Sequence, residues 1–335
     1  MNLLPKLHCD FSKHDYWESF FASCKTTFEW YGDYIQLSDI VSKYVKKSDK
    51  ILMVGCGNSD LSRMIYDMNA CHDILSIDAN ETVIAQMIDK HNSNGQRPGL
   101  IYKCLDVLNL HGYIDASISL SKEGRSHFSC VIDKGTLDAL HTHEGSEETV
   151  EMMFQQIDYA LQLSGRYIVI TLAQAHILQS ICAYFIERKP EWVVQIHQIT
   201  SNSDQESPRA SFPLPVFAFV FVKLRRSPDH LPRLSIMPLA QKQQINMSWV
   251  VNPTELSAQI KEWIKMEQEL CLLRHELVFH FLGHYRSGKQ NEFHFLCPDN
   301  DFVVFQCRYV AINTSIRSKV VAPSAVYLVP FGDHK

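Results

Sequence analysis

From Lys50 onward, the chain alternates short apolar runs with longer amphipathic stretches, and this alternation limits the folds open to it. Apolar residues recur at helical spacing in residues 58–68, 80–92, 146–162 and 174–188. Around these stretches lie seven strand-like runs: ILMV (51–54), DILSI (73–77), LIYKC (100–104), FSCVI (128–132), RYIVIT (166–171), WVVQIHQI (192–199) and PVFAFVFVK (215–223). Strands that alternate with helices are joined by right-handed crossovers, so we predict an α/β fold with a parallel sheet covered on both faces.

The end of this pattern differs from the rest. The last two runs are separated only by the polar segment SNSDQESPRAS (201–211), which has no helical spacing. Strands without a crossover helix pair antiparallel, so we expect the sheet to end in an antiparallel hairpin. Residues 110–127 also lack firm periodicity, and we expect a long surface loop there.

The segments on either side of the sheet have a different character. Residues 1–48 predict two helices: Asp15 can cap a short one that carries Trp17 and Phe21, and Asp33 begins a second with apolar positions 35, 37, 40, 41, 44 and 45. Residues 227–238 contain three prolines and mark a linker. Beyond it, a helix over 253–271 and strand-like runs at 277–284, 292–297, 302–310 and 325–329 predict a small α+β region. We therefore expect a helical segment at 1–48, a main domain at 49–226 and a joining region at 227–335.

Composition excludes several classes of protein. Of the 335 residues, 46% are hydrophobic and 21% charged, near globular averages, so a long disordered chain is excluded. The formal net charge of -5 provides no basic field for nucleic acid or an anionic membrane. The longest apolar run, 214–222, is interrupted by Pro215 and is far shorter than the roughly 20 residues of a spanning helix. We expect no direct nucleic-acid partner and no membrane.

The cysteines indicate the compartment. Ten cysteines form no Cys-x-x-Cys pair and lie mostly within apolar runs, as buried thiols of a reducing compartment do. Lys6 and Asp10 interrupt the N-terminus before a signal peptide's apolar core could form. We therefore expect a cytoplasmic protein.

The first strand runs into the turn GCGNSD. Gly55 and Gly57 can adopt positive φ and let a ligand approach the backbone, and a helix that opens near Asn58 would present its N-terminus to that ligand. The second strand ends in IDAN, where Asp78 lies 23 residues after Gly55. In doubly wound folds an acid about 20 residues beyond the turn binds ribose hydroxyls. The turn and the acid together predict a site for a nucleotide-like cofactor.

Dinucleotide and S-adenosylmethionine sites share this arrangement and differ at the third glycine, where this chain has Asp60. A carboxylate there would repel a pyrophosphate, so Asp60 favours S-adenosylmethionine, which has no phosphate. After the third strand, Asp106 is placed to bind the adenine amino group and Val107 to donate its N–H to the ring; a turn cap is the alternative role for Asp106. Four candidates follow the first four strands, at the edge where such sheets bind ligands: Gly55, Asp78, Asp106 and Asp133.

Five motifs together resemble a known family: DYWESFF, FEWYG, VGCGNSDLS, DKGTLDAL and LAQAHIL. Over residues 3–223, and more weakly to its end, the chain is similar to the N-terminal half of the methyltransferase-like protein 13 family. That family methylates a lysine and the N-terminus of eukaryotic translation elongation factor 1-alpha, and a shorter relative methylates another lysine of the same factor. The resemblance implies a class I seven-stranded S-adenosylmethionine-dependent methyltransferase, Rossmann-like with an antiparallel terminal hairpin, whose protein partner is the elongation factor.

The resemblance also implies a cofactor site, carried over by motif. With Gly57 of the same turn, its residues are Trp17, Phe21, Trp30, Gly55, Asp78, Ala79, Asp106, Val107 and Lys134. The aromatics of DYWESFF and FEWYG, which packing alone would also explain, become a cofactor lid over 1–48. Phe21 stands where the shorter relative has Tyr. The segment 110–127 is longer than the corresponding segment in the family. The family also carries a second, spermidine-synthase-like domain that lies beyond Lys335, so we expect a truncated or spliced form without N-terminal methylation.

Methyl transfer to lysine is an in-line displacement by a neutral amine, although the ordinary pKa of lysine is about 10.4. We expect Asp133 to orient or desolvate the amine, with Asp138, Thr171 and Gln174 nearby; a buried helix cap is an equally open role for Asp138. No metal is expected, because HELVFH (275–280) has one residue too many between Glu and the second His for a zinc helix, and its β-rich composition argues against a helix.

Two other functions stay open beside lysine methylation of the elongation factor. One is a methyltransferase for another protein or a small molecule. The other is a catalytically silent methyltransferase fold that only binds a partner. Affinity for S-adenosylmethionine separates the silent fold from both enzymes.

Overall fold

The computed structural model describes residues 8–24, 26–68, 70–92, 95–120, 127–142, 145–189, 191–199, 215–225, 231–232, 249–250 and 252–287. The chain divides into two compact units, one of Met1–Thr200 with Leu214–Gln268 and one of Ser201–Pro213 with Glu269–Lys335. The sheet and every site considered below lie in the first unit. In the second, the described residues are the C-terminal part of one helix.

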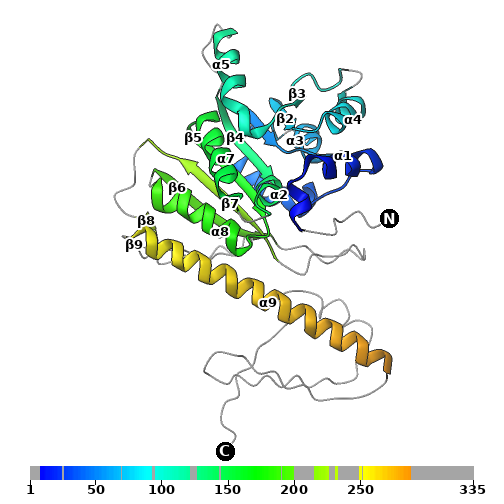
Figure 1. The fold of residues 1–335 in the computed structure, drawn as a ribbon, viewed down its shortest axis with the longest axis vertical. Coiled ribbons are helices and arrows are strands. Elements are labelled where there is room, and N and C mark those ends of the chain that lie inside the picture. Colours follow the sequence, from blue (N-terminus) through cyan, green and yellow to red (C-terminus); the bar gives the residue numbers. More distant parts are fainter. Residues whose placement is uncertain are drawn as a thin grey trace, which may run out of the picture. The chain divides into compact units, whose positions relative to one another are not determined.

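A seven-stranded sheet forms the centre of the first unit (Figure 1). Its strands are β1 (Ile51–Val54), β2 (Ile74–Asp78), β3 (Leu100–Cys104), β4 (Phe128–Lys134), β5 (Leu161–Thr171), β6 (Trp192–Ile199) and β7 (Val216–Lys223), in the order β3-β2-β1-β4-β5-β7-β6. Strands β1 to β5 are parallel, and β7 pairs antiparallel with both β5 and β6. The predicted sheet and its antiparallel terminal hairpin are confirmed, and with them the class I methyltransferase fold.

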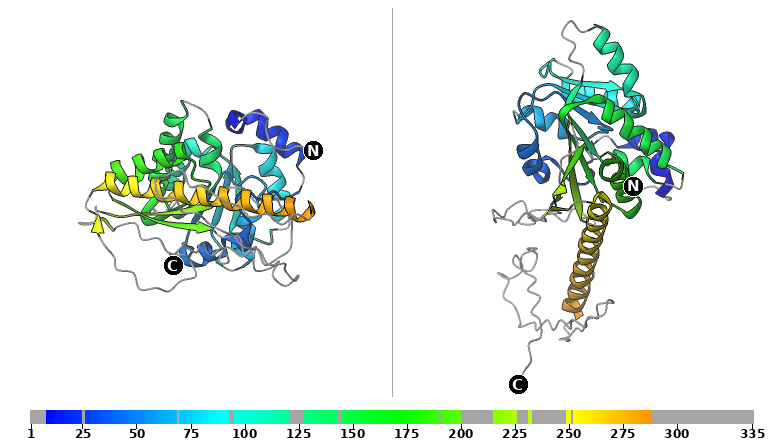
Figure 2. Two further views of the ribbon diagram at one scale, coloured as in Figure 1. Left: turned by 90° about the horizontal axis from the view of Figure 1, so that it is seen from below. Right: turned by 90° about the vertical axis from the view of Figure 1, so that its left-hand side faces the viewer.

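Helices cover both faces of this sheet, because alternate strand residues point to opposite sides (Figure 2). On one face, Ile51, Met53 and their neighbours pack against α1 (His14–Ser23), α2 (Tyr34–Tyr44), α3 (Leu61–Asp67) and α4 (Glu81–Asn92). On the other face, Leu52, Val54 and their neighbours pack against α5 (Leu110–Leu120), α7 (Glu147–Ala160), α8 (Ala175–Ile181), the π-helix Cys182–Arg188 and the first half of α9 (Pro253–Ser287). The remaining elements are η1 (His8–Ser12), η2 (Val107–Asn109), α6 (Thr136–Leu140) and the strand pair β8 (Leu231–Pro232) with β9 (Trp249–Val250).

The N-terminal segment is helical as predicted, with differences at single residues. Asp33 caps α2 by accepting a hydrogen bond from the Gln36 N–H, and the Gln36 side chain returns the bond in a capping box. Asp15 lies in the first turn of α1 and is not its cap, a position held by Lys13. Ile35, expected on the buried face of α2, is 74% exposed.

Two predictions of secondary structure were wrong. Residues 110–120 form α5 and not a loop, because Leu110 and Ile114 lie one turn apart and are both fully buried. Residues 275–284, where the composition of HELVFH argued against a helix and a strand was expected at 277–284, continue α9, since neither proline nor glycine interrupts the sequence between Pro253 and Gly283. The runs expected at 292–297, 302–310 and 325–329, and the polar segment 201–211, lie outside the described residues.

The main unit extends beyond the boundary expected near residue 226. The first half of α9 clusters with the sheet, and its residues Leu256, Ile260, Trp263 and Ile264 are buried in the core. Among the described residues, no helix is both long and apolar enough to cross a membrane. Those residues also contain no group of three or more His, Cys, Asp or Glu side chains that could hold a metal ion.

Candidate functional site

The glycine turn between β1 and α3 lies against the segment that follows β4. Gly55 and Gly57 have φ values of 54° and 49°, which glycine adopts without strain. A Cβ on Gly55 would lie 2.0 Å from the Thr136 Oγ1, whose hydroxyl donates to the Val54 carbonyl at 3.0 Å. Gly55 is therefore required for packing within the protein, and this packing brings the turn and residues 133–138 together.

Asp78, at the end of β2, is tied to the same turn. Its two carboxylate oxygens accept the N–H groups of Gly57 and Asn80, each at 2.9 Å. Burial raises the pKa of Asp78, and these two hydrogen bonds oppose the rise. Each oxygen keeps a free lone pair, so the carboxylate can still accept a hydroxyl from a ligand. Ala79, the next predicted residue, accepts a contact from the Cys104 Sγ at 3.6 Å through its carbonyl.

Asp106 and Val107 lie after β3, as predicted. The Asp106 side chain caps η2 by accepting the Leu108 N–H at 2.9 Å, which is the turn-cap role left open above. The side chain is exposed, whereas Val107 is buried. A contact between either residue and adenine stays a prediction.

Three aromatic residues of the N-terminal segment, Trp17, Phe21 and Trp30, lie in contact and are called the aromatic cluster. The Trp17 ring stacks on Phe21 with centroids 5.7 Å apart and meets Trp30 edge-on at 6.1 Å. The Phe21 ring lies 3.4 Å from the position of a Cβ on Gly57. The aromatic cluster thus reaches the glycine turn and packs the N-terminal segment onto it; contact with a cofactor stays a prediction.

Lys134, at the end of β4, is bound to the segment that carries Trp30. Its Nζ makes an ion pair with Glu29 and donates to the carbonyls of Trp30 and Gly32 at 3.0 and 3.2 Å. Burial lowers the pKa of Lys134, and Glu29 opposes this shift. Lys134 therefore fastens residues 29–32 to the sheet.

Glu29 was missed by the sequence analysis. Besides Lys134, its carboxylate accepts the Ser59 hydroxyl at 2.6 Å and the Asp60 N–H at 2.7 Å, just before α3 begins. A carboxylate is favoured at a helix N-terminus by the unpaired N–H groups there. The only signal in the sequence was an acid inside an aromatic motif, and nothing in that motif identified its partners.

Asp60 requires a correction. Its carboxylate contacts Arg63 at 3.1 Å, Lys90 at 2.7 Å and the His91 Nε2 at 2.9 Å. Burial alone would raise the pKa of Asp60, but hydrogen bonds from His91, Lys90 and Arg63 hold it well below its ordinary value. Because these partners neutralise its charge, the argument that Asp60 repels a pyrophosphate loses its electrostatic basis.

The two candidate catalytic acids differ in access: Asp133 lies near the end of β4, just before α6, and Asp138 lies in the first turn of α6. Asp133 is fully buried and accepts the N–H groups of Thr136 (2.8 Å) and Leu137 (3.2 Å) and the Tyr167 hydroxyl (3.0 Å). Burial, reinforced by Asp138, raises the pKa of Asp133 to about 7. Asp133 thus anchors α6 to the sheet, and its oxygens are occupied by protein donors.

Asp138 has one occupied oxygen and one free. Its Oδ1 accepts hydroxyls from Thr171 (2.9 Å) and Tyr31 (3.2 Å) and the Leu172 N–H (3.3 Å). Its Oδ2 is buried and has no hydrogen-bond partner among the described residues. Burial raises the pKa of Asp138 to about 6. A buried, unpaired carboxylate oxygen is costly, which marks this atom as a place for a ligand donor.

Tyr31 was also missed by the sequence analysis, although it lies inside FEWYG. Its φ of 59° is unusual for a tyrosine, and burial together with Asp138 raises the pKa of its hydroxyl far above the ordinary value. Its ring lies 3.1 Å from the position of a Cβ on Gly135, so that glycine makes room for it. Of the two other residues expected here, Thr171 contacts Asp138, and Gln174 occupies the N-cap position of α8.

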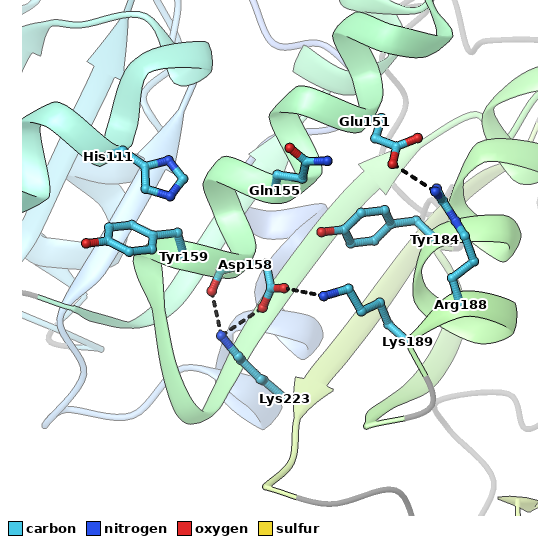
Figure 3. A pocket seen from close by; sticks show the side chains of 9 residues that line it. All are labelled: His111, Glu151, Gln155, Asp158, Tyr159, Tyr184, Arg188, Lys189 and Lys223. Carbon is cyan, nitrogen blue, oxygen red and sulfur yellow. Dashed lines mark hydrogen bonds and ion pairs between the residues drawn. The ribbon is translucent and has the colours of Figure 1, made fainter.

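A separate pocket of about 590 Å³ lies mainly between α7 and the π-helix, beside the end of β7 (Figure 3). Asp158, just before β5, pairs with Lys189 at 3.2 Å and with Lys223, at the end of antiparallel β7, at 2.7 Å. Arg188 pairs with Glu151 at 2.8 Å. These charges satisfy one another, so the candidate site remains at the glycine turn. The pocket is lined by His111, Glu151, Gln155, Asp158, Tyr159, Tyr184, Arg188, Lys189 and Lys223.

The sequence is similar to proteins named eEF1A lysine and N-terminal methyltransferase. The eEF1A lysine and N-terminal methyltransferase of Mus musculus is 40% identical over 269 residues, which are 78% of this chain and 36% of that protein. The Xenopus laevis protein of the same name is 32% identical over 335 residues, 99% of this chain and 44% of that protein. Over most of its length, this chain is similar to these proteins. It spans less than half the length of these eEF1A lysine and N-terminal methyltransferases.

Other comparisons are weaker. EEF1A lysine methyltransferase 4 of Bos taurus is 31% identical over 183 residues, 52% of this chain and 66% of that protein. No family model matches the chain. Among solved structures, an rRNA methylase from Streptococcus thermophilus is 14% identical, covers 58% of this chain and 98% of its own, and has a TM-score of 0.39, a likeness too low to add to the observed strand order.

Proposed function

We propose that this chain binds S-adenosylmethionine at the glycine turn and transfers its methyl group to a lysine side chain of translation elongation factor 1-alpha. The relatives named above support the reaction and the substrate. The observation that carries the proposal is the Asp138 Oδ2, a buried carboxylate oxygen without a hydrogen-bond partner in the described part of the chain. It lies on the segment that packs against Gly55 through Thr136, so an acceptor for an amine lies near the predicted cofactor turn.

The residues around the turn fit this cofactor. Asp78 keeps lone pairs for ribose hydroxyls, and the aromatic cluster lies against Gly57 through Phe21. Aromatic rings attract cations, which suits a positively charged sulfur. When bound, S-adenosylmethionine supplies a methyl group on that sulfur, to which a neutral amine nitrogen bonds as the carbon–sulfur bond breaks.

The chain's own residues would prepare the amine. Tyr31, Thr171 and the Leu172 N–H all hold the Asp138 Oδ1, so its Oδ2 stays available to a lysine ammonium. Because the pKa of Asp138 is raised to about 6, the carboxylate is ionised at neutral pH and is a stronger proton acceptor than an ordinary aspartate. We assign Asp138 the contact with the amine and Asp133 the positioning of α6.

The proposal extends to the cofactor contacts predicted from the motifs and to the compartment. Trp17, Trp30, Ala79, Asp106, Val107 and Lys134 all lie near strand ends or on the segments packed there, which supports a shared site. A cytoplasmic location is supported by the pattern of cysteines, eight of which are free thiols in the described part of the chain.

The test uses the purified chain, labelled S-adenosylmethionine and purified elongation factor 1-alpha. We expect label in the factor and, by mass spectrometry, methylation of a lysine. Labelling of another protein in a cell lysate, with none in the factor, would replace the substrate. Absent or millimolar binding of S-adenosylmethionine in calorimetry would instead indicate a silent methyltransferase fold.

A further inference from the structure

The first half of α9 is part of the same core as the candidate site. Leu256, Ile260, Trp263 and Ile264 recur at helical spacing and are buried, and the Trp263 ring meets the fully buried Phe217 of β7 at 5.6 Å. The helix is therefore held firmly against the sheet up to Gln268, the last residue of the first unit. A side chain on this part of α9 can act as a fixed support for its neighbours.

Gln268 contacts the turn that follows β5. Its Nε2 donates to the Leu172 carbonyl at 2.9 Å and to the Ala173 carbonyl at 3.0 Å. The two N–H bonds of a glutamine amide match these two acceptors. One side chain of α9 thus holds two successive carbonyls of the turn.

This turn is strained and also holds the candidate amine acceptor. Ala173 is fully buried and has a φ of 52°, a conformation that is unfavourable in a residue with a Cβ and persists only when its surroundings impose it. The Ala173 N–H donates to the Thr171 Oγ1 at 2.9 Å, and the Thr171 hydroxyl donates to the Asp138 Oδ1 at 2.9 Å. The Leu172 N–H donates to the same oxygen at 3.3 Å.

We propose that Gln268 is a positioning residue for methyl transfer. This inference rests on the function proposed above. By holding the carbonyls of Leu172 and Ala173, it keeps the turn in the conformation that directs the Thr171 hydroxyl and the Leu172 N–H to the Asp138 Oδ1. The Oδ2 is thereby left for the amine. The helix beyond the predicted domain boundary is then a component of the active site.

The test replaces Gln268 in the whole chain by Leu, which cannot donate, and by Glu, which has nearly the same shape and is ionised at neutral pH. The matched control is Gln259→Leu on the same helix, because the Gln259 side chain donates to Glu255 of that helix at 3.2 Å. Methyl transfer to the elongation factor gives kcat and KM, calorimetry gives affinity for S-adenosylhomocysteine, and thermal unfolding identifies variants that remain folded.

We expect the folded Gln268 variants to lose kcat by on the order of 10- to 100-fold, the size of effect of a misplaced catalytic group. Affinity for S-adenosylhomocysteine should stay within about twofold, since the glycine turn and Asp78 are untouched. The acid limb of the kcat profile should move to higher pH, because hydrogen bonds to the ionised carboxylate lower the pKa of Asp138 and some of them would be lost. A structural role alone would not move this limb.

A Gln268 variant that is folded and matches Gln259→Leu in kcat and in its pH profile would overturn the inference. If the unaltered chain binds the cofactor but transfers no methyl group, the proposed function has failed instead. The two failures are distinguished by the activity of the unaltered chain.

Discussion

At the scale of single residues, Asp138 and Asp133 share one short segment but have different surroundings. Replacing Asp138 by Asn should lower kcat/KM by about 100-fold, within the range of general-base contributions. The unaltered chain should lose activity as the pH falls through about 6, because a raised pKa means that Asp138 takes up its proton there. Rates between pH 5 and 8 check this, with exposed Asp39→Asn as the control. Equal kcat/KM in the two variants would remove Asp138 from the chemistry.

Asp133→Ala should affect stability first. The substitution leaves the buried Tyr167 hydroxyl and the first N–H groups of α6 without their acceptor, which costs about 2–4 kcal/mol of unfolding free energy. Burial raises the pKa of Asp133 to about 7 in the folded chain, against an ordinary value near 4 when unfolded. Ionisation therefore disfavours folding, and the contribution of Asp133 to stability falls as the pH rises from about 4 to about 7. Denaturant melts at pH 5 and 8 measure this slope, which should be smaller in Asp133→Ala; an unchanged slope would contradict the prediction.

At the scale of elements, the glycine turn is held by a close approach of two segments. Gly55→Ala and Gly95→Ala both place a Cβ at positive φ, but the first Cβ would meet the Thr136 Oγ1 at 2.0 Å and the second has nothing within 4 Å. Gly95→Ala should cost about 1 kcal/mol for the backbone alone, whereas Gly55→Ala should cost at least 2 kcal/mol more. Denaturant unfolding compares the two, and similar losses would show that the turn can move away from α6.

The ion pair of Glu29 and Lys134 fastens residues 29–32 to β4 and α3. If Lys134 acts through this segment, Glu29→Gln and Lys134→Met should each weaken binding of S-adenosylhomocysteine by about tenfold, and the double variant should be no weaker than either alone. If Lys134 instead contacts the cofactor directly, Glu29→Gln should bind S-adenosylhomocysteine with nearly normal affinity. Calorimetry on the three variants and the unaltered chain completes the cycle.

The sequence predicted elements better than contacts between them. Each strand of the sheet was predicted within a few residues because its buried run is continuous, and only β5 proved much longer, since Leu161 pairs with Phe128 before a break in register. The segment 110–120 was missed because Gly112 and its serines obscured the apolar spacing. Asp78 was predicted from a fixed offset after the turn. Tyr31 and Glu29 were not, because their partners lie 107 and 105 residues away and no local spacing encodes such pairs.

At the scale of the whole molecule, α9 determines where the first compact unit ends. Trp263→Ala should lower the free energy of unfolding by about 3–5 kcal/mol, because it removes a buried indole from its contact with Phe217 and leaves a cavity in the core below β7. Met266→Ala on the same helix is the matched control, since Met266 is 48% exposed and should change stability by about 0.5 kcal/mol or less. Both are measured by denaturant unfolding of the whole chain, followed through the sheet by circular dichroism. A single shared transition that Trp263→Ala shifts would show that the helix and sheet fold together, whereas a sheet transition equal to that of Met266→Ala would restore the boundary at residue 226.

Because Gln268 lies little more than one helical turn beyond Trp263, loss of this packing should also release the turn at Ala173. Methyl transfer by folded Trp263→Ala should therefore fall, as it should in the Gln268 variants.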